Sequence, residues 1–212
     1  MSPTIRHFSR LLGTAMVALL PVLGTVSAAQ AATAVTYDLQ ATAAGQTANF
    51  TLGVQVTGSA PSTVASGSNF NVALSVGSIT VPTSASGYTV KQIQNIDLKI
   101  PVPANSTYVS SSLSGGSNLG SGTPSVSEGN GVVDVAIPGP IAAGQTATLP
   151  TLTLTLTAGA SGQTVVSTLA GTSYSDPGLT FTAVVSVFIF NVNANTVGYP
   201  TTTPALTTTT IQ

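Results

Sequence analysis

Apolar residues alternate with threonine or other polar residues in several stretches of this sequence. The clearest is 151–157 (TLTLTLT), and similar runs cover 49–56, 70–76 and 133–137. Side chains of a β-strand point alternately to its two faces, so this pattern predicts strands with one apolar and one hydroxyl-bearing face. No window after residue 31 has the period of about 3.6 residues, with caps, that predicts a helix.

Glycine, proline and serine separate these short runs, which is typical of an all-β protein. We therefore predict an antiparallel β-sandwich, or a related barrel, over residues 32–190. Asn130-Gly131 is a strong hairpin signal before the run 133–137. The inward positions of the runs predict these core residues: Phe50, Val54, Phe70, Leu74, Leu98, Val135, Leu154 and Phe181.

The run 90–100 changes register part-way. Ile96, Leu98 and Ile100 share one parity, whereas Ile93 has the other. A β-bulge inserts one extra residue and so switches the face to which later side chains point. We expect a bulge or bend near Gln94-Asn95 that brings all four residues to the core side.

The first 31 residues have the three-part order of a secretory signal peptide. Arg6, His7 and Arg10 form a positive region, the apolar run 11–23 follows, and small residues come next. Pro21 interrupts the apolar run, which is shorter than the about 20 residues of a membrane anchor. We place cleavage after Ala31, with Ala28 as the alternative.

Composition after this segment excludes several kinds of chemistry. Only 4% of the chain is charged, there is no Cys or Trp, and the one His is His7. The part from residue 32 onwards therefore has no His or Cys for catalysis or metal binding and no Arg for a phosphate clamp. Its two lysines against five carboxylates also lack the basic footprint of a nucleic-acid-binding protein. We expect no cofactor and no metal.

Two segments look different from the strands. Residues 110–127 are rich in Ser and Gly, which predicts a long loop or an irregular edge, and residues 191–212 predict an extended Thr/Pro-rich tail. The hexapeptide AAGQTA occurs at 43–48 and again at 142–147. Two tandem sub-domains with a boundary near residue 100 would explain the repeat. A common turn that leads into a strand explains it equally and is the simpler interpretation.

The stretches 100–105 (IPVPAN), 133–137 and 142–156 resemble the last strands of immunoglobulin-like repeats in bacterial surface proteins. The whole chain is also similar to uncharacterised secreted proteins of high-GC Gram-positive bacteria, which share the signal peptide, a pattern like 171–181 and a Thr-rich end. The resemblance implies an immunoglobulin-like sandwich outside the cytoplasmic membrane. It implies no catalytic residues.

Glu128 and Asp134 are the best candidates for a catalytic pair. With Asn130 at the turn apex, Asp134 would lie opposite Val126 and Glu128 opposite Val132, so both carboxylates would share one face about 7–8 Å apart. Inverting glycosidases use two carboxyl groups at about 6.5–9.5 Å. That face points outward, however, and no basic group lies nearby to tune a pKa. We therefore assign no catalytic residue.

Other chemistry-bearing residues also have simpler explanations. Lys91 and Lys99 could form an isopeptide bond only if buried, and the alternation places them on the surface. Asp176-Pro177-Gly178 could contribute to a calcium loop, but one carboxylate is too few, and a Pro-Gly turn accounts for all three residues.

Ala183 to Phe190 (AVVSVFIF) is the most hydrophobic stretch after the signal peptide. Its length fits a strand rather than a membrane helix. Since both of its faces are apolar, it is either a central strand, which we favour, or a strand that contacts a partner, a second copy or lipid.

We expect a non-catalytic protein of the cell envelope or surface with a structural, adhesive or binding role, in contact with glycans or envelope proteins. A porin-like β-barrel of an outer envelope layer is the alternative, although it lacks the usual aromatic girdles. A carboxylate-dependent glycoside hydrolase is a more remote one.

The signal-peptide interpretation predicts that the exported protein begins at Ala32 or Ala29. N-terminal sequencing of the protein recovered outside the cytoplasmic membrane measures this directly. An exported protein that still begins with Met1 or Ser2 would contradict the interpretation.

Overall fold

The structure, a computed structural model, describes residues 27–29 and 32–212. Apart from 27–29, the predicted signal peptide lies outside the described residues. Within them the chain forms strands, turns and loops with no helix, as the alternation predicts. Accordingly, no helix able to cross a membrane occurs among them.

Eighteen strands are present in the described residues. The long ones are β2 (Thr33–Ala43), β3 (Gln46–Pro61), β5 (Asn69–Val76), β8 (Tyr88–Pro101), β9 (Ser106–Ser114), β14 (Thr151–Ala158), β16 (Leu179–Val187) and β17 (Phe190–Pro200). The hairpin strands β10 (Ser125–Gly129) and β11 (Val132–Ile137) are shorter. The remaining strands are β1 (Ser27–Ala29), β4 (Thr63–Val64), β6 (Ile79–Thr80), β7 (Ser84–Ala85), β12 (Ile141–Ala142), β13 (Thr146–Ala147), β15 (Thr164–Ser167) and β18 (Thr207–Ile211).

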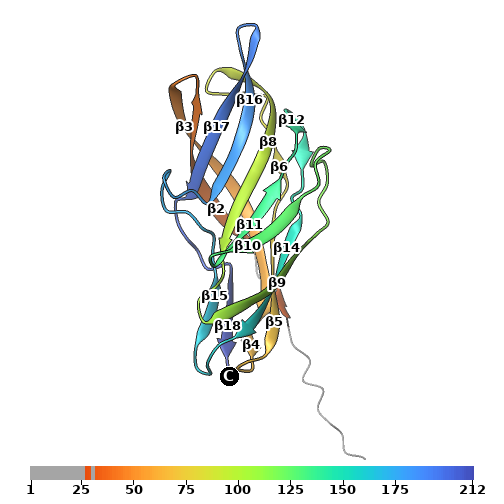
Figure 1. The fold of residues 1–212 in the computed structure, drawn as a ribbon, viewed down its shortest axis with the longest axis vertical. Coiled ribbons are helices and arrows are strands. Elements are labelled where there is room, and N and C mark those ends of the chain that lie inside the picture. The colour runs from red at the N-terminus through yellow and green to blue at the C-terminus, as the bar shows by residue number, and fades with distance from the viewer. Residues whose placement is uncertain (1–26, 30–31) are drawn as a thin grey trace, which may run out of the picture.

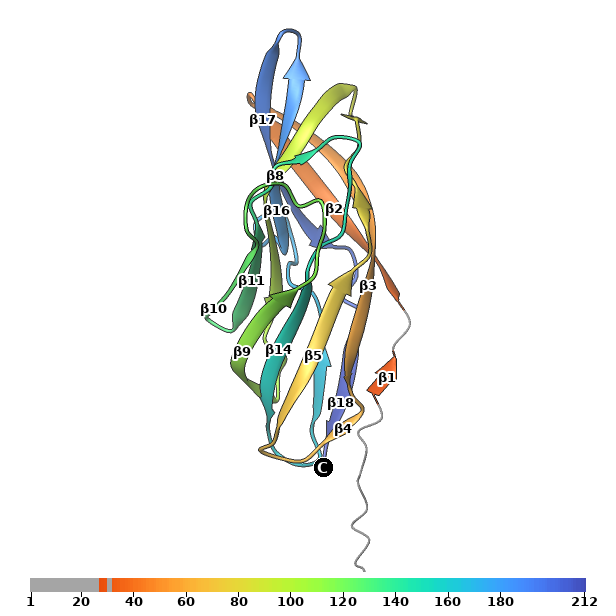
Figure 2. The same ribbon diagram turned by 90° about the vertical axis from the view of Figure 1, so that its right-hand side faces the viewer.

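One continuous antiparallel sheet forms the body of the molecule. Its hydrogen-bonded order is β10-β11-β8-β16-β17-β2-β3-β5-β14-β9. The two ends of this path, β10 and β9, contact each other, so the sandwich is nearly closed into a barrel (Figures 1 and 2). Strands from before and after residue 100 are mixed along the path, and the sheet has no division at that point.

The two ends of the elongated molecule are built differently. Near the C-terminus, β3, β5, β14 and β9 face the strands on the other side of the sandwich (Figure 2). At the opposite end β5 pairs with β3 only from Val56 to Ser59, so the part of β3 before Val56 has β2 as its sole partner strand among the described residues. There, residues 77–87, which we call the strap, cover the inner face of β2, β3, β8 and β16 in place of a second sheet.

Apolar side chains on the inner faces form the core. Leu154 is fully buried, and Phe70, Leu74 and Val135 are also buried as predicted, with 7%, 6% and 5% of their surfaces exposed. The other four predicted core residues, Phe50, Val54, Leu98 and Phe181, point inward but are only half-buried. The direction in which the alternation points these side chains is therefore confirmed, but four of them lack full cover.

The predicted bulge in β8 is confirmed. Asp97 pairs with Thr180 of β16, and Gln94 pairs with Thr182, so one extra residue of β8 lies between the two pairs. Asn95 has a φ of 52°, a left-handed conformation that Asn tolerates. The extra residue brings Ile93 and Ile96 to the same side.

The predicted register of the β10–β11 hairpin is wrong by one residue. Glu128 lies opposite Val133 and Asp134 opposite Ser127. Asn130 and Gly131 together form a two-residue turn, both with positive φ (55° and 77°), rather than Asn130 alone at the apex. Of the segment 110–127, residues up to Ser114 belong to β9 and those from Ser125 to β10, so the irregular part is shorter than predicted.

Residues 191–212 are extended, as their composition predicts, but they belong to the fold and do not form a tail. Residues 191–200 all belong to β17, which pairs with β16 and β2. Thr207 and Thr209 of β18 are buried, and their hydroxyls donate to Ser167 Oγ (2.8 Å) and to the Pro61 carbonyl (2.7 Å). Gly58 of β3 leaves no space for a Cβ because the backbone at Leu206 packs directly against it.

Strand β14 allows a test of which face of the sheet points to the core. Leu154 is fully buried, whereas Thr153 is on the opposite face. We expect Leu154→Ala to lower the free energy of unfolding by about 2–5 kcal/mol because it leaves a cavity. Thr153→Ala is the matched control and should cost much less. Chemical denaturation measures both, and equal losses would contradict the assignment of the two faces.

Candidate functional site

A large apolar cavity lies between the strap and the curved inner face of the sheet. Its volume is about 370 Å³. Protein interiors are close-packed, and voids larger than a water molecule are few. A cavity of this size is within the about 300–1,000 Å³ typical of small-molecule sites.

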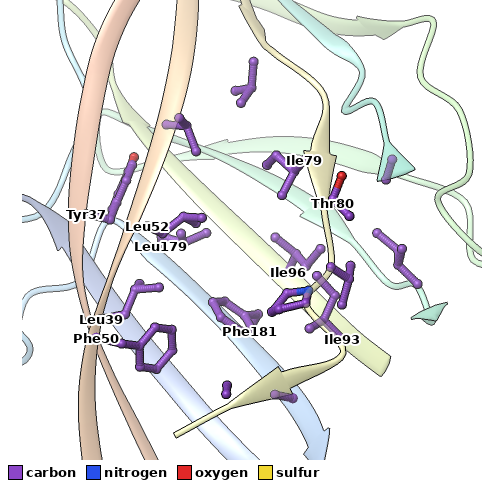
Figure 3. A pocket seen from close by; sticks show the side chains of 18 of the residues that line it. Tyr37, Leu39, Phe50, Leu52, Ile79, Thr80, Ile93, Ile96, Leu179 and Phe181 are labelled. Carbon is purple, nitrogen blue, oxygen red and sulfur yellow. The ribbon is translucent and has the colours of Figure 1, made fainter. Parts of the chain in front are cut away.

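The strands β2, β3, β8 and β16 and the strap form most of the walls, and Ile141, Ala147, Leu149 and Leu169 complete them. Figure 3 shows two facing groups of lining residues. The first group, on β2 and β3, is Tyr37, Leu39, Phe50 and Leu52. The second group is Ile79 and Thr80 of the strap with Ile93 and Ile96 of β8. Phe181 of β16 lies between these two groups (Figure 3), and Leu179 of the same strand also lines the cavity. The alternation of the strands explains this lining, since each strand contributes every second side chain. The bulge at Gln94-Asn95 is what lets Ile93 and Ile96 both reach the cavity.

The half-buried core residues are explained by this cavity. Phe50, Val54, Leu98 and Phe181 all line it. Sequence analysis identified them as inward-facing but placed them in a filled core. Only the arrangement in space shows that no other side chain fills the volume in front of them.

In the described part of the chain, one edge of β3 beside the cavity has no partner strand over most of its length before Val56. Two short strands of the strap pair with other strands, β7 with β8 and β6 with β13. The strap also bonds to β3 at its first residue, where Gly77 N donates to the Gln55 carbonyl (2.8 Å). Beyond this bond no strand pairs with the outer edge of β3 among the described residues. The half-exposed Phe50 and Leu52 lie along this free edge. The cavity residues with exposed hydroxyl groups are Thr51, Thr80, Ser84 and Ser86.

One polar group is buried in the wall of the cavity. Tyr37 is 2% exposed, and its hydroxyl is buried with no hydrogen-bond partner among the described residues. Burial raises the pKa of Tyr37 well above its ordinary value, so the hydroxyl stays protonated and available as a donor. A buried hydroxyl without a partner costs about 1–3 kcal/mol, because the hydrogen bond to water that it loses on burial is not replaced.

The carboxylates singled out in the sequence lie elsewhere and do not form the predicted pair. Glu128 is opposite the buried Val133, and its Oε1 accepts a bond from Gly131 N at 2.9 Å within its own turn. Asp134 has the opposite parity and lies on the outer face. The one-residue error in register therefore separates the two carboxylates onto different faces.

Asp134 has a different neighbour, Asp97, which sequence analysis missed. Asp134 pairs with Lys99 across β11 and β8, and Asp97 is two residues from Lys99 on the same outer face. Burial raises the pKa of Asp97, the negative charge of Asp134 raises it further, and Lys99 lowers it. The pairing of two strands far apart in sequence creates this group, so no local pattern could reveal it.

The remaining candidates have structural roles. Lys91 is exposed and Lys99 is half-buried on the outer face, outside the core that an isopeptide bond requires. Asp176 Oδ2 accepts a hydrogen bond from Thr172 Oγ1 (2.8 Å) in an exposed turn. Among residues 27–29 and 32–212, no three potential metal-ligating side chains of His, Cys, Asp or Glu lie together.

Comparisons with known proteins give a fold and no family. No protein-family model matches the chain, and no curated protein matches it. Among solved structures, the chain is similar to one described as a putative membrane anchored protein from Corynebacterium diphtheriae, with a TM-score of 0.59 and 18% sequence identity. The likeness covers 86% of this chain but 38% of that one. At this identity it shows a shared all-β architecture.

Proposed function

We propose that this chain is a non-catalytic protein of the bacterial cell envelope that binds an extended apolar molecule, such as a lipid acyl chain, in the cavity behind the strap. The observation that carries the proposal is the 370 Å³ apolar cavity with a single buried, unpartnered hydroxyl in its wall. The signal-peptide pattern and the likeness to a protein described as membrane anchored support the envelope location.

The energetics of the cavity favour an occupant. An unfilled, enclosed apolar cavity lowers the free energy of unfolding by about 24 cal/mol per Å³. A cavity of this size therefore destabilises the protein even if it is partly open. An apolar cavity of about 150 Å³ stays dry and binds small hydrocarbons. The cavity of this protein is larger and has hydroxyl groups at its rim. An apolar chain that fills it recovers the lost contacts while its polar end stays near the opening.

The cavity suits a lipid better than a glycan. Sugars carry hydroxyl groups that need hydrogen-bond partners when buried. The inner walls offer Tyr37 and otherwise consist largely of aliphatic side chains and Phe. The porin-like alternative has less support, because inward-facing side chains of this sheet are apolar and many outward ones are hydroxyl-bearing, the reverse of a protein whose outer surface contacts lipid tails.

Filling the cavity should abolish binding. Ala183 points into the cavity from β16, whereas its neighbour Thr182 is on the other face. We expect Ala183→Phe to weaken binding of cis-parinaric acid, a fluorescent polyene fatty acid, by at least about tenfold, because the new ring occupies the volume of the ligand. Fluorescence titration measures the affinity. Thr182→Phe is the control of equal size and should bind as the parent does. Absence of saturable binding to the parent would contradict the proposal.

Replacing Tyr37 by Phe should have two opposite effects. Removing an unpaired buried hydroxyl should raise the melting temperature of the ligand-free protein. It should also weaken fatty-acid binding by roughly three- to tenfold, which corresponds to one lost hydrogen bond, and leave binding of a hydrocarbon without oxygen unchanged. A lower melting temperature would mean that the hydroxyl already has a structural partner and does not serve a ligand.

The absence of catalysis is part of the proposal. Glu128 and Asp134 lie on different faces, and a Ser or Thr nucleophile would need a neighbouring base, for which the part from residue 32 onwards offers no His. We expect the processed protein to show no turnover of polysaccharide, ester or peptide substrates. Turnover in the parent that both Glu128→Gln and Asp134→Asn abolish would contradict this expectation.

A further inference from the structure

The β16–β17 hairpin ends in an exposed apolar tip. Its residues Phe188, Ile189 and Phe190 are 96%, 89% and 67% exposed, the most exposed large hydrophobic side chains in the described residues. The hairpin extends past its neighbours, since its pairing with β8 begins at Ser186 and that with β2 at Asn195. The tip therefore stands at the end of the molecule opposite the C-terminus (Figures 1 and 2).

Other hairpin turns of this protein show how unusual this sequence is. In the part of the chain that the structure describes, three further two-residue turns join paired strands, and they consist of Ala44-Gly45, Ser86-Gly87 and Asn130-Gly131. In each, small or polar residues adopt the positive φ angles that such a turn requires. In the fourth turn, Phe188 has a φ of 54°, a conformation that is unfavourable for a bulky side chain. The turn thus presents two large apolar residues where its geometry favours Gly or Asn.

We propose that this tip inserts into the surface of a lipid bilayer. Three side chains on a narrow projection are far too small for a stable protein–protein interface, which needs about 800 Å² from each partner. Insertion between lipid headgroups needs no complementary surface and buries the side chains from all sides. A convex tip therefore fits a bilayer better than a second copy of this chain.

The surroundings of the tip fit a membrane surface. The turns at 44–45 and 86–87 lie at the same end, and the adjoining residues 40–49, 84–96 and 183–195 contain no acidic side chain. Lys91 is the one charged residue in these segments, and it is exposed. Tyr88 is 46% exposed beside the turn at 86–87. A Tyr and a Lys behind an apolar tip match the residues that are enriched at membrane interfaces.

The tip and the cavity are connected through β16. Leu179, Phe181 and Ala183 line the cavity, and the strand continues through Val187 to the tip. The free edge of β3, which borders the cavity, starts at the same end of the molecule. Docking at the tip would therefore bring this edge of the cavity towards the bilayer, and this role in loading a lipid rests on the proposed function.

Because the chain has no Trp, a single introduced Trp reports on its own environment without background. We would measure emission of Phe188→Trp, in the protein without residues 1–31, on adding phosphatidylcholine vesicles containing phosphatidylglycerol. We expect a blue shift and an intensity increase. Val109→Trp is the control, since Val109 is 48% exposed on β9, away from the tip, and should show no change. No shift at position 188, or equal shifts at both positions, would overturn the proposal.

A second variant separates the tip from the cavity. Replacing Phe188, Ile189 and Phe190 together by Ser should reduce co-flotation with the same vesicles at least tenfold and leave cis-parinaric acid binding unchanged. The control, Val109→Ser with Val166→Ser, should retain flotation. Failure of the proposed function would appear instead as loss of fatty-acid binding in the parent. A parent that dimerises through the tip in sedimentation experiments and ignores vesicles would assign the tip to a second copy and overturn the proposal.

Discussion

The burial of one apolar sheet face against a partner is the constraint on which this structure depends. A sheet with one apolar face must pack that face against something else. Near the C-terminus, opposite sides of the nearly closed sheet supply the partner for each other, and Leu154 and Leu156 are fully buried there. At the other end β5 separates from β3 beyond Val56, and the strap, with the neighbouring segment 141–149, takes its place. The cavity results from this incomplete replacement.

The outer faces of the sheet carry hydroxyl groups rather than charged groups. Thr155 Oγ1 donates to Asn71 Oδ1 at 3.0 Å and Thr157 Oγ1 to Asn69 Oδ1 at 2.8 Å across neighbouring strands. Threonine suits this role because its branched Cβ favours strands while its hydroxyl pairs across the ladder. In a chain of which only 4% of the residues are charged, these hydroxyl pairs supply much of the polar character of the outer faces.

Much of the fold could be predicted from the sequence because a strand pattern is local. The inward positions of Phe50 and Phe181 and the bulge at Gln94-Asn95 follow from parity alone. The hairpin register depended on treating Asn130-Gly131 as one two-residue turn, a signal that was present but assigned to a single apex residue. Thr207 and Thr209 could not be identified as buried, because an all-Thr strand shows no apolar alternation.

The candidate site was beyond the reach of sequence reasoning for a related physical reason. A cavity is a volume that no side chain fills, so it depends on the distance between β3 and the strap rather than on the identity of any residue. The same side chains that predict a core, such as Leu98 and Phe181, line a cavity when the facing layer is a single strap instead of a sheet. The residue that gives the cavity chemical character, Tyr37, looked like an ordinary core aromatic, because an unpaired hydroxyl is recognised only when all of its neighbours are known. Strand β16 passes from this cavity to the exposed tip, so one largely apolar segment, Ala183 to Phe190, lies in two different environments, and its sequence pattern alone does not distinguish them.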